Sequence, residues 1–316
     1  MRPERGPSAV TGQRSEINPP GRFEVFYEGL TEFSVDLFVR AEVHDAQWRG
    51  TVRGPFCATA RTLLSTHEFT PRPPGDGTRA VARIADPCFW SGDSPALYRL
   101  DVEIMRGGVS LGSWQTQIGF RALSAARGGV YWSRRRVVLR GVDHRLAVAQ
   151  GIEAWRAASA ALYAPDPCGA LLGATSRGGV AVMAEIDVDR DDYLDVAQCC
   201  ARAASVLVIV VDCANDDPRG GAVRQVARNC LLAQRWTPES SSSPAPWADL
   251  VIGSVDDPAR FAARYSAVGV PVLAERRIKG PHELHHARAL CDQLQRDLAP
   301  WGDYSGYLIT AAGGRE

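Results

Sequence analysis

The hydrophobic pattern of this chain changes its period near residue 130, and this change constrains the fold more than any other feature. Before that point apolar and polar residues alternate, which is typical of half-buried antiparallel strands. After it, short apolar runs alternate with amphipathic segments of helical period, which indicates parallel βα units. The 316 residues are enough for two separate cores. We therefore predict a β domain over residues 22–124 and an α/β domain over residues 130–316.

The first half predicts an immunoglobulin-like β-sandwich. Its clearest strand is FSVDLFVRAEV, in which one face is predicted to be buried and carries Phe33, Val35, Leu37, Val39, Ala41 and Val43. Turns rich in Gly, Pro and Asp separate seven short strand candidates, which is the pattern of such a sandwich. The expected strands are 23–29, 33–43, 46–53, 60–70, 78–85, 97–105 and 112–121.

The second half predicts a compact (β/α)8 TIM barrel. Its eight strand candidates are 137–142, 159–164, 179–186, 206–213, 231–236, 249–255, 271–276 and 306–311. Helical segments fall between most of them, for example at 190–203 and 282–298. The alternative is an open doubly wound sheet, which would need a Gly-rich phosphate turn after its first strand. GVDHRL at 141–146 is no such turn, and the barrel is therefore preferred.

Composition excludes several classes of function. The 36 basic and 36 acidic side chains cancel, which argues against a nucleic-acid or anionic-membrane partner. Residues 1–21 are polar and rich in Pro, Gly, Arg and Ser, and they predict a disordered tail without a secretory signal. The eight cysteines form no CxxC pair. They are expected to be reduced thiols of a cytoplasmic protein, with neither a metal nor a cofactor.

Acidic residues dominate the predicted carboxyl ends of the barrel strands, where barrel enzymes place their functional groups. These ends carry Asp143, His144, Glu185, Asp187, Asp212, Asn215, Asp216, Asp217, Asp256, Asp257 and Glu275. Two opposed carboxylates on one rim suit the cleavage of a glycosidic bond. The alternative interpretation is that Asp187, Asp217 and Asp257 cap helices.

Seven segments resemble glycoside hydrolase family 2, in unbroken order over residues 22–316. They are DPCFWSGDSPALYRLDVEI (86–104), IGFRAL (118–123), VVLRGVDHR (137–145), YAPDPCGALLGATSRGGVAVMAEI (163–186), SVLVIVVDCAND (205–216), GVPVLAER (269–276) and GYLITA (306–311). The resemblance implies an immunoglobulin-like sandwich followed by a TIM barrel. It also implies retaining hydrolysis of a β-O-glycosidic bond in carbohydrate metabolism.

The same resemblance assigns roles to individual positions. Glu275 falls on the nucleophile, Asp216 on the general acid/base, and Asn215 on the residue that bonds the sugar 2-hydroxyl. His144 matches the histidine after the first barrel strand. The remaining candidates for substrate contact are polar residues at the strand ends, namely Asp143, Glu185 and Tyr163.

Several positions depart from the family pattern. Asp216 stands where the family has Glu, which withdraws the carboxyl by about 1.5 Å. The second strand lacks the family's Arg and His, and Thr310 replaces the tryptophan of the last strand. Arg276 and Arg277 follow the nucleophile position and could pair with Glu275. A non-catalytic carbohydrate-binding or scaffold pseudoenzyme is therefore the alternative to a glycosidase.

The resemblance also implies the partners. A carbohydrate is the expected ligand. In the family, a sugar-binding jelly roll precedes the sandwich, and nothing in this sequence matches it. The sequence therefore leaves open a homo-oligomer or a partner chain that supplies the jelly roll.

Overall fold

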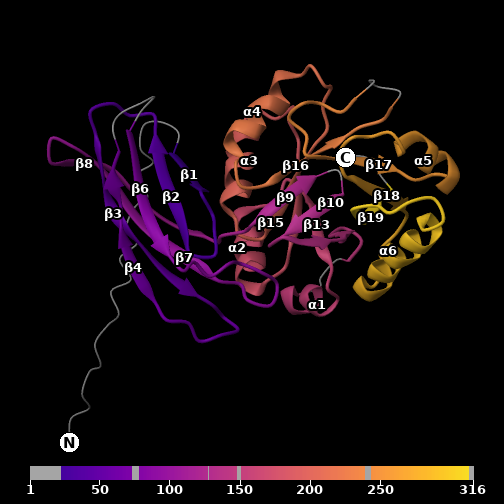
Figure 1. Cartoon of the computed structure of the whole chain (residues 1–316), viewed down its shortest axis with the longest axis horizontal. Coiled ribbons are helices and arrows are strands. Elements are labelled where there is room, and N and C mark those ends of the chain that lie inside the picture. The colour runs from indigo at the N-terminus through magenta and orange to yellow at the C-terminus, as the bar shows by residue number, and fades with distance from the viewer. Residues whose placement is uncertain (1–22, 73–77, 127, 148–150, 239–242, 313–316) are drawn as a thin grey trace, which may run out of the picture.

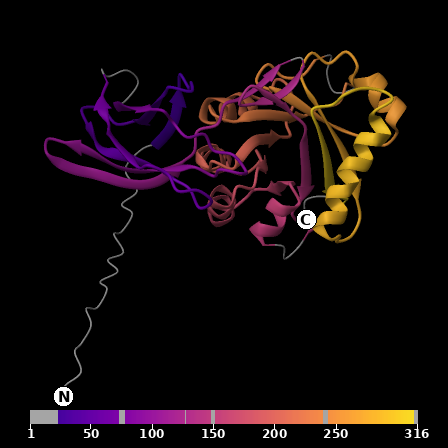
Figure 2. The same ribbon diagram turned by 60° about the horizontal axis from the view of Figure 1, so that its bottom comes forward.

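The computed structural model describes residues 23–72, 78–126, 128–147, 151–238 and 243–312. A β-sandwich and a barrel lie side by side, and this arrangement is plain in both views (Figure 1, Figure 2). The predicted tail at residues 1–21 lies outside the described residues. The predicted fold class, an antiparallel sandwich followed by a closed (β/α)8 barrel, is confirmed.

Two four-stranded antiparallel sheets form the sandwich, in the orders β1-β2-β6-β5 and β4-β3-β7-β8. The strands are β1 Phe23–Glu28, β2 Ser34–Ala41, β3 Gln47–Phe56, β4 Ser65–Glu68, β5 Thr70–Pro71, β6 Thr78–Ala85, β7 Leu97–Arg106 and β8 Val109–Ile118. The strand predicted at 60–70 is split, because the chain crosses from one sheet to the other at the buried residue Phe69.

The predicted alternation holds within β2 and fails at its start. Val35, Leu37 and Val39 are buried between the sheets, as expected. Phe33, however, is 76% exposed, so its assignment to the buried face was wrong. Phe33 precedes the strand, in a turn where its backbone N–H donates to the Thr31 hydroxyl, and the strand's alternation does not extend to it.

Eight parallel strands close the barrel, and the open-sheet alternative is therefore wrong. In order around the barrel the strands are β12 Leu139–Asp143, β13 Ala161–Pro165, β14 Val182–Ile186, β15 Val206–Val211, β16 Leu231–Arg235, β17 Leu250–Ser254, β18 Val272–Ile278 and β19 Gly306–Ala311. The first strand pairs with both the second and the last. Gly141 permits the closure, because a Cβ there would lie 2.5 Å from the Leu308 side chain.

A small three-stranded sheet connects the two domains. It consists of β9 Leu123–Ala126, β10 Gly129–Trp132 and β11 Arg135–Val137. Val130 of this sheet belongs to the same apolar cluster as Leu139, Met183 and Leu308 of the barrel interior. The chain thus packs against the interior of the barrel before it forms the first barrel strand.

Six helices accompany the barrel in the described part of the chain. They are α1 Ile152–Ala157, α2 Gly169–Gly178, α3 Tyr193–Arg202, α4 Pro218–Val226, α5 Pro258–Tyr265 and α6 Leu284–Leu298. Asp217 and Asp257 cap α4 and α5 through their side chains, as the cap interpretation predicted. Asp187 accepts instead from the backbone N–H of Asp189 within a loop, so that interpretation was wrong for Asp187.

Arg121 joins the sandwich to the barrel. Its side chain is buried, and its Nη1 donates to the backbone carbonyls of Ala203 and Ala204 at 2.7 Å each and to that of Val206. Nη2 donates to the carbonyl of Asn229 at 3.2 Å. The first carbonyls lie just beyond the end of α3, where the helix dipole is negative and favours a cation. A single guanidinium therefore satisfies several buried carbonyls of the neighbouring domain.

Two further contacts hold the same junction. The Asn229 side chain exchanges two hydrogen bonds of 2.9 Å with the backbone of Tyr27. The indole N–H of Trp90, from the sandwich side, donates to the carbonyl of Ser176 at 2.8 Å. These groups are largely removed from water, so each needs its hydrogen-bond partner. The hydrogen bonds therefore fix the geometry of the junction together with its apolar contacts.

We expect Arg121→Met to lower the free energy of unfolding by at least about 3 kcal/mol, because it leaves several buried carbonyls without a donor. Urea unfolding followed by tryptophan fluorescence measures the loss. Arg79→Met is the control, since Arg79 is exposed on β6, and it should change stability by less than about 0.5 kcal/mol. Equal midpoints for the two variants would contradict this role for Arg121.

Candidate functional site

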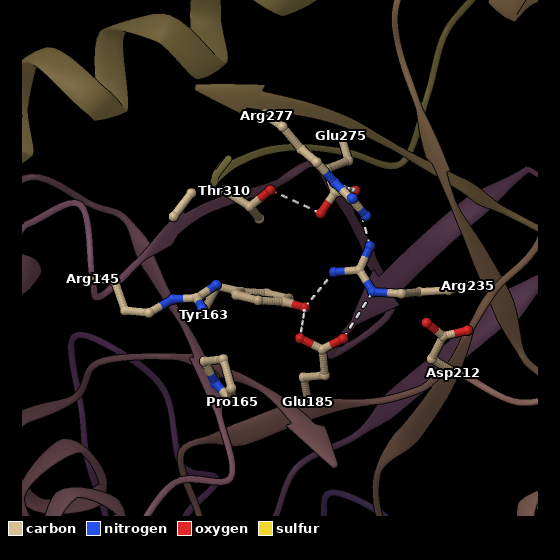
Figure 3. Close-up of a pocket in the computed structure, with 10 residues that line it drawn as sticks. Arg145, Tyr163, Pro165, Glu185, Asp212, Arg235, Glu275, Arg277 and Thr310 are labelled. Carbon is tan, nitrogen blue, oxygen red and sulfur yellow. Dashed lines mark hydrogen bonds and ion pairs between the residues drawn. The ribbon is translucent and has the colours of Figure 1, made fainter. Parts of the chain in front are cut away.

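A polar cavity of about 310 Å³ lies at the carboxyl ends of the barrel strands (Figure 3). It is lined by Arg145, Tyr163, Pro165, Glu185, Asp212, Arg235, Glu275, Arg277, Thr310 and Ala311. These residues come from several different strands or from the loops directly after them. The barrel fold places functional groups at this end, since the βα loops converge there.

Glu275 is the most enclosed carboxylate of the cavity, with only 1% of the residue exposed. Its Oε1 accepts a hydrogen bond of 2.9 Å from the Thr310 hydroxyl. Its Oε2 accepts from Arg235 Nη1 at 2.9 Å and from Arg277 Nε at 3.3 Å. Burial opposes ionisation of this carboxyl, but the positive charge and hydrogen bond of Arg235 outweigh it and lower the pKa of Glu275.

Glu185 lies across the cavity and shares the same arginine. Arg235 Nε donates to Glu185 Oε1 at 2.9 Å, and the Tyr163 hydroxyl donates to Oε2 at 2.5 Å. The Tyr163 oxygen itself accepts from Arg235 Nη2, so its proton points to Glu185. Burial raises the pKa of Tyr163 well above its ordinary value, which keeps that proton in place.

Arg235 therefore connects the two halves of the cavity. Its side chain is 14% exposed, and its guanidinium bonds Glu185, Tyr163 and Glu275 at once, as Figure 3 shows. Burial by itself would lower the pKa of Arg235, but the surrounding Tyr163 and the two glutamates raise it. The sequence prediction missed this residue, although an arginine that ends the apolar run LLAQR was a signal of a charged partner inside the rim.

Asp143 and His144 lie beside the cavity and do not line it. Asp143 is fully buried at the end of β12, and its carboxylate is held by the guanidinium of Arg145, with Arg145 Nη2 at 2.7 Å from Oδ2. The backbone N–H of Ala311 also donates to this carboxylate, at 3.2 Å. The Nδ1 atom of His144 lies 3.7 Å from Asp143 Oδ1. Asp143 thus fixes Arg145, which is the member of this group that reaches the cavity.

The two residues predicted after the fourth barrel strand lie outside the cavity lining. Asn215 accepts from Gln234 Nε2 at 2.8 Å and donates to the carbonyl of Ser243 at 2.5 Å. Asp216 is exposed in the turn that precedes α4. Asp212, directly after β15, is the residue of that loop that lines the cavity. The structure therefore gathers Glu275, Glu185 and Tyr163 in one cavity, and the roles assigned to Asn215, Asp216 and His144 stay predictions.

The described residues contain no cluster of side chains that suits metal chemistry. No group of three or more His, Cys, Asp or Glu side chains there is arranged to hold a metal ion. All eight cysteines are free thiols, of which three, Cys200, Cys230 and Cys291, are buried. None of the described helices is both long enough and apolar enough to cross a membrane.

Comparison with known proteins agrees with this architecture. The family model of Glycosyl hydrolases family 2 matches residues 24–121, which is the sandwich domain. Over these residues the chain is similar to family 2 proteins. No curated protein matches it over its sequence. The predicted resemblance to this family is thereby confirmed for the sandwich by sequence, and the barrel that follows has the matching fold.

Solved structures with the same fold cover nearly the whole chain of this family 2-like protein. A family 2 glycosyl hydrolase from Bacteroides cellulosilyticus aligns over 92% of the chain with a TM-score of 0.59 and 13% identity. The apo b-glucuronidase from Ruminococcus gnavus aligns over 92% with a TM-score of 0.61 and 14% identity. Bacteroides uniformis beta-glucuronidase 2, covalently bound to cyclophellitol-6-carboxylate aziridine, aligns over 92% with a TM-score of 0.54 and 11% identity. The chain spans 43%, 62% and 45% of these proteins, respectively.

We expect Arg235→Met to destabilise the protein by about 3 kcal/mol at pH 7, because it leaves the buried Glu275 carboxylate without its main partner. The lowered pKa of Glu275 means that the pair contributes stability above the ordinary value of 4.5 and loses it as the pH falls below that value. The difference between wild type and variant should therefore shrink between about pH 5 and about pH 3. Urea unfolding at several pH values measures it.

The control for this prediction is the same substitution in a Glu275→Gln background. A glutamine amide at that position carries no charge to lose, so Arg235→Met should cost less there, and its cost should depend less on pH. A cost that stays constant across this pH range in both backgrounds would show that Arg235 acts through packing alone.

Proposed function

We propose that this chain is a family 2-like carbohydrate-binding protein whose barrel no longer hydrolyses glycosides. One observation carries the proposal. The carboxylate at the nucleophile position, Glu275, is closed off by hydrogen bonds on both oxygens and is 1% exposed. A nucleophile has to bring a free oxygen lone pair to the anomeric carbon of the sugar.

The cost of freeing that oxygen is large. Oε2 would have to leave Arg235 and Arg277, and Oε1, which accepts one hydrogen bond from Thr310, would have to turn its second lone pair toward the sugar. Separating a buried carboxylate from its arginine costs about 3–5 kcal/mol, which corresponds to a loss in rate of at least about a hundredfold. In a working enzyme the supporting groups stabilise the nucleophile without occupying its reactive side.

The carboxyl that faces Glu275 across the cavity is already engaged in hydrogen bonds. Retaining hydrolysis needs a second carboxyl that protonates the leaving oxygen. The carboxyl that lies across the cavity is that of Glu185, but both of its oxygens accept hydrogen bonds, from Arg235 and from Tyr163. Asp216, which the family pattern assigns to this task, lies outside the cavity lining.

Sugar binding rests on the size and polarity of the cavity. A volume of about 310 Å³ is at the lower end of the range for small-molecule sites and suits one sugar ring. Arg145, Arg277 and Asp212 are the lining residues with the most exposed polar groups, and they can hydrogen-bond hydroxyl groups at the mouth. The structural neighbours that carry this fold are glycosidases, which supports a sugar as the ligand class.

A second candidate is retaining hydrolysis of a β-O-glycoside with Glu275 as nucleophile. Two observations favour it. The lowered pKa of Glu275 keeps it in the ionised form that a nucleophile needs. Asp212 lines the same cavity, is exposed, and forms no hydrogen bond or ion pair with any described residue, so it is available as a proton donor.

Aryl glycosides separate the two candidates. We expect wild type to release no aryl alcohol above the buffer blank from β-glucuronide, β-galactoside or β-mannoside substrates, because Glu275 is closed off. Absorbance of the released phenol measures turnover. Release that disappears in both Glu275→Gln and Asp212→Asn would establish the second candidate and end the first.

Binding is tested separately by calorimetry with the methyl β-glycosides of the same three sugars. We expect at least one to bind wild type, and Ala311→Trp to abolish that binding because the new ring fills the cavity from the end of β19. Ala58→Trp, on the sandwich, is the matched control and should bind as wild type does. Absence of binding to wild type would instead favour a scaffold role for the barrel.

A further inference from the structure

A second cavity system lies between the sandwich and the barrel, and it shares no residue with the barrel cavity. Its larger part, of about 430 Å³, is lined by Phe56, Cys57, Ala58, Thr62, Leu64, Pro95, Leu97, Gln117 and Arg177. A smaller part of about 220 Å³ adjoins it and shares Leu97 and Gln117. Both domains contribute to the wall, since α2 and the end of α3 face strands β7 and β8. We call this system the interdomain crevice.

The floor of the crevice is apolar. Leu97 and Leu172 are buried in it, and Phe56 and Leu64 line it while they remain 38% and 40% exposed to solvent. Large apolar side chains that line a hollow and stay in contact with water are typical of a ligand-binding surface. An apolar body bound there would be removed from water together with these side chains, which favours binding.

The crevice also carries positive charge without a balancing carboxylate. Arg177 lies in the last turn of α2 and Arg202 in the last turn of α3. Neither side chain forms a hydrogen bond or ion pair with any residue in the described ranges, and no Asp or Glu among those residues lines either part of the crevice. The dipole of each helix favours a cation at its carboxyl end. Neither arginine, however, has a carboxylate partner among the described residues. Other arginines of the barrel, such as Arg219 and Arg224, are paired.

We propose that the interdomain crevice binds a small amphiphilic carboxylate, a molecule with an apolar body and one anionic head. The body lies against Leu97, Leu64 and Phe56, and the head accepts hydrogen bonds from Arg177. Arginine suits this role because its planar guanidinium binds a carboxylate through two parallel hydrogen bonds. Arg202 adds positive charge in the adjoining part and favours the same sign of ligand.

Cys57 provides a reporter inside the crevice. Its thiol lies 3.3 Å from the Thr59 hydroxyl and 3.9 Å from the Ser94 hydroxyl. Partial burial opposes ionisation, but these hydrogen bonds outweigh it and lower the pKa of Cys57, which favours the thiolate form that reacts with alkylating agents. Cys88 is exposed and lines neither part of the crevice, and it therefore serves as an internal control.

The test uses octanoate as the probe and iodoacetamide labelling as the readout, with each cysteine followed by peptide mass spectrometry. We expect octanoate to slow the labelling of Cys57 and to leave that of Cys88 unchanged. Octan-1-ol, which has the same apolar body without the charge, should protect at least about tenfold less well, since one charge-assisted pair is worth about 1.4 kcal/mol or more.

Three variants localise the effect. Arg177→Gln should weaken octanoate protection by about tenfold, and Ala58→Trp should abolish it by filling the larger part. Arg260→Gln, at an exposed arginine of α5 away from the crevice, should behave as wild type. Unfolding midpoints of the three variants establish that each is folded.

The proposal is overturned if octanoate fails to protect Cys57 of wild type at millimolar concentration. It is equally overturned if octanoate and octan-1-ol protect alike, or if Arg177→Gln binds as wild type does. These outcomes are independent of glycoside binding or hydrolysis, because the barrel cavity and the crevice have no residue in common.

Discussion

The parallel pairing of β12 with β19 is the interaction on which the rest of the structure depends. This pairing closes the barrel. Leu139 lies opposite Gly306 at one end of the ladder, and Val142 lies opposite Ile309 at the other. Closure turns eight separate strand ends into one ring, so that Glu185, Arg235 and Glu275, which are far apart in sequence, meet in one cavity. In an open sheet the same three strand ends would lie along an edge, and no single guanidinium could span them.

The ring of strand ends is held together by charge as well as by backbone pairing. Arg235 bonds the carboxylates of Glu185 and Glu275 and the hydroxyl of Tyr163. The loss of any member of such a buried network lowers the stability of the fold, because its partners are left unpaired. When the network is complete, its polar groups are hydrogen-bonded. Under the proposed function, the hydrogen bonds that complete this network are also what keeps Glu275 from acting as a nucleophile.

The junction of the two domains shows a different use of arginine. Arg121 is buried and is surrounded by backbone carbonyls, whereas Arg177 and Arg202, on the same side of the barrel, reach a crevice whose described lining contains no carboxylate. One arginine thus fixes the relative position of the domains. The other two give the space between the domains a positive potential above an apolar floor. A rigid junction is what allows residues of two domains to form one persistent cavity.

The sequence alone determined the period of each segment, and the period determined the architecture: alternation in β2 predicted a sandwich strand, and short apolar runs such as VLVIVV in β15 predicted barrel strands. It also placed Glu275, Glu185 and Tyr163 at strand ends, because position along a strand is local information. Which side chains meet across the ring was decided only by the tertiary structure. The partner of Glu275 is Arg235 from a strand two places away in the barrel, and the loop residue that lines the cavity after β15 is Asp212 instead of Asp216. Barrel closure and loop conformation fix these distances, and neither is encoded in local hydrophobic periodicity.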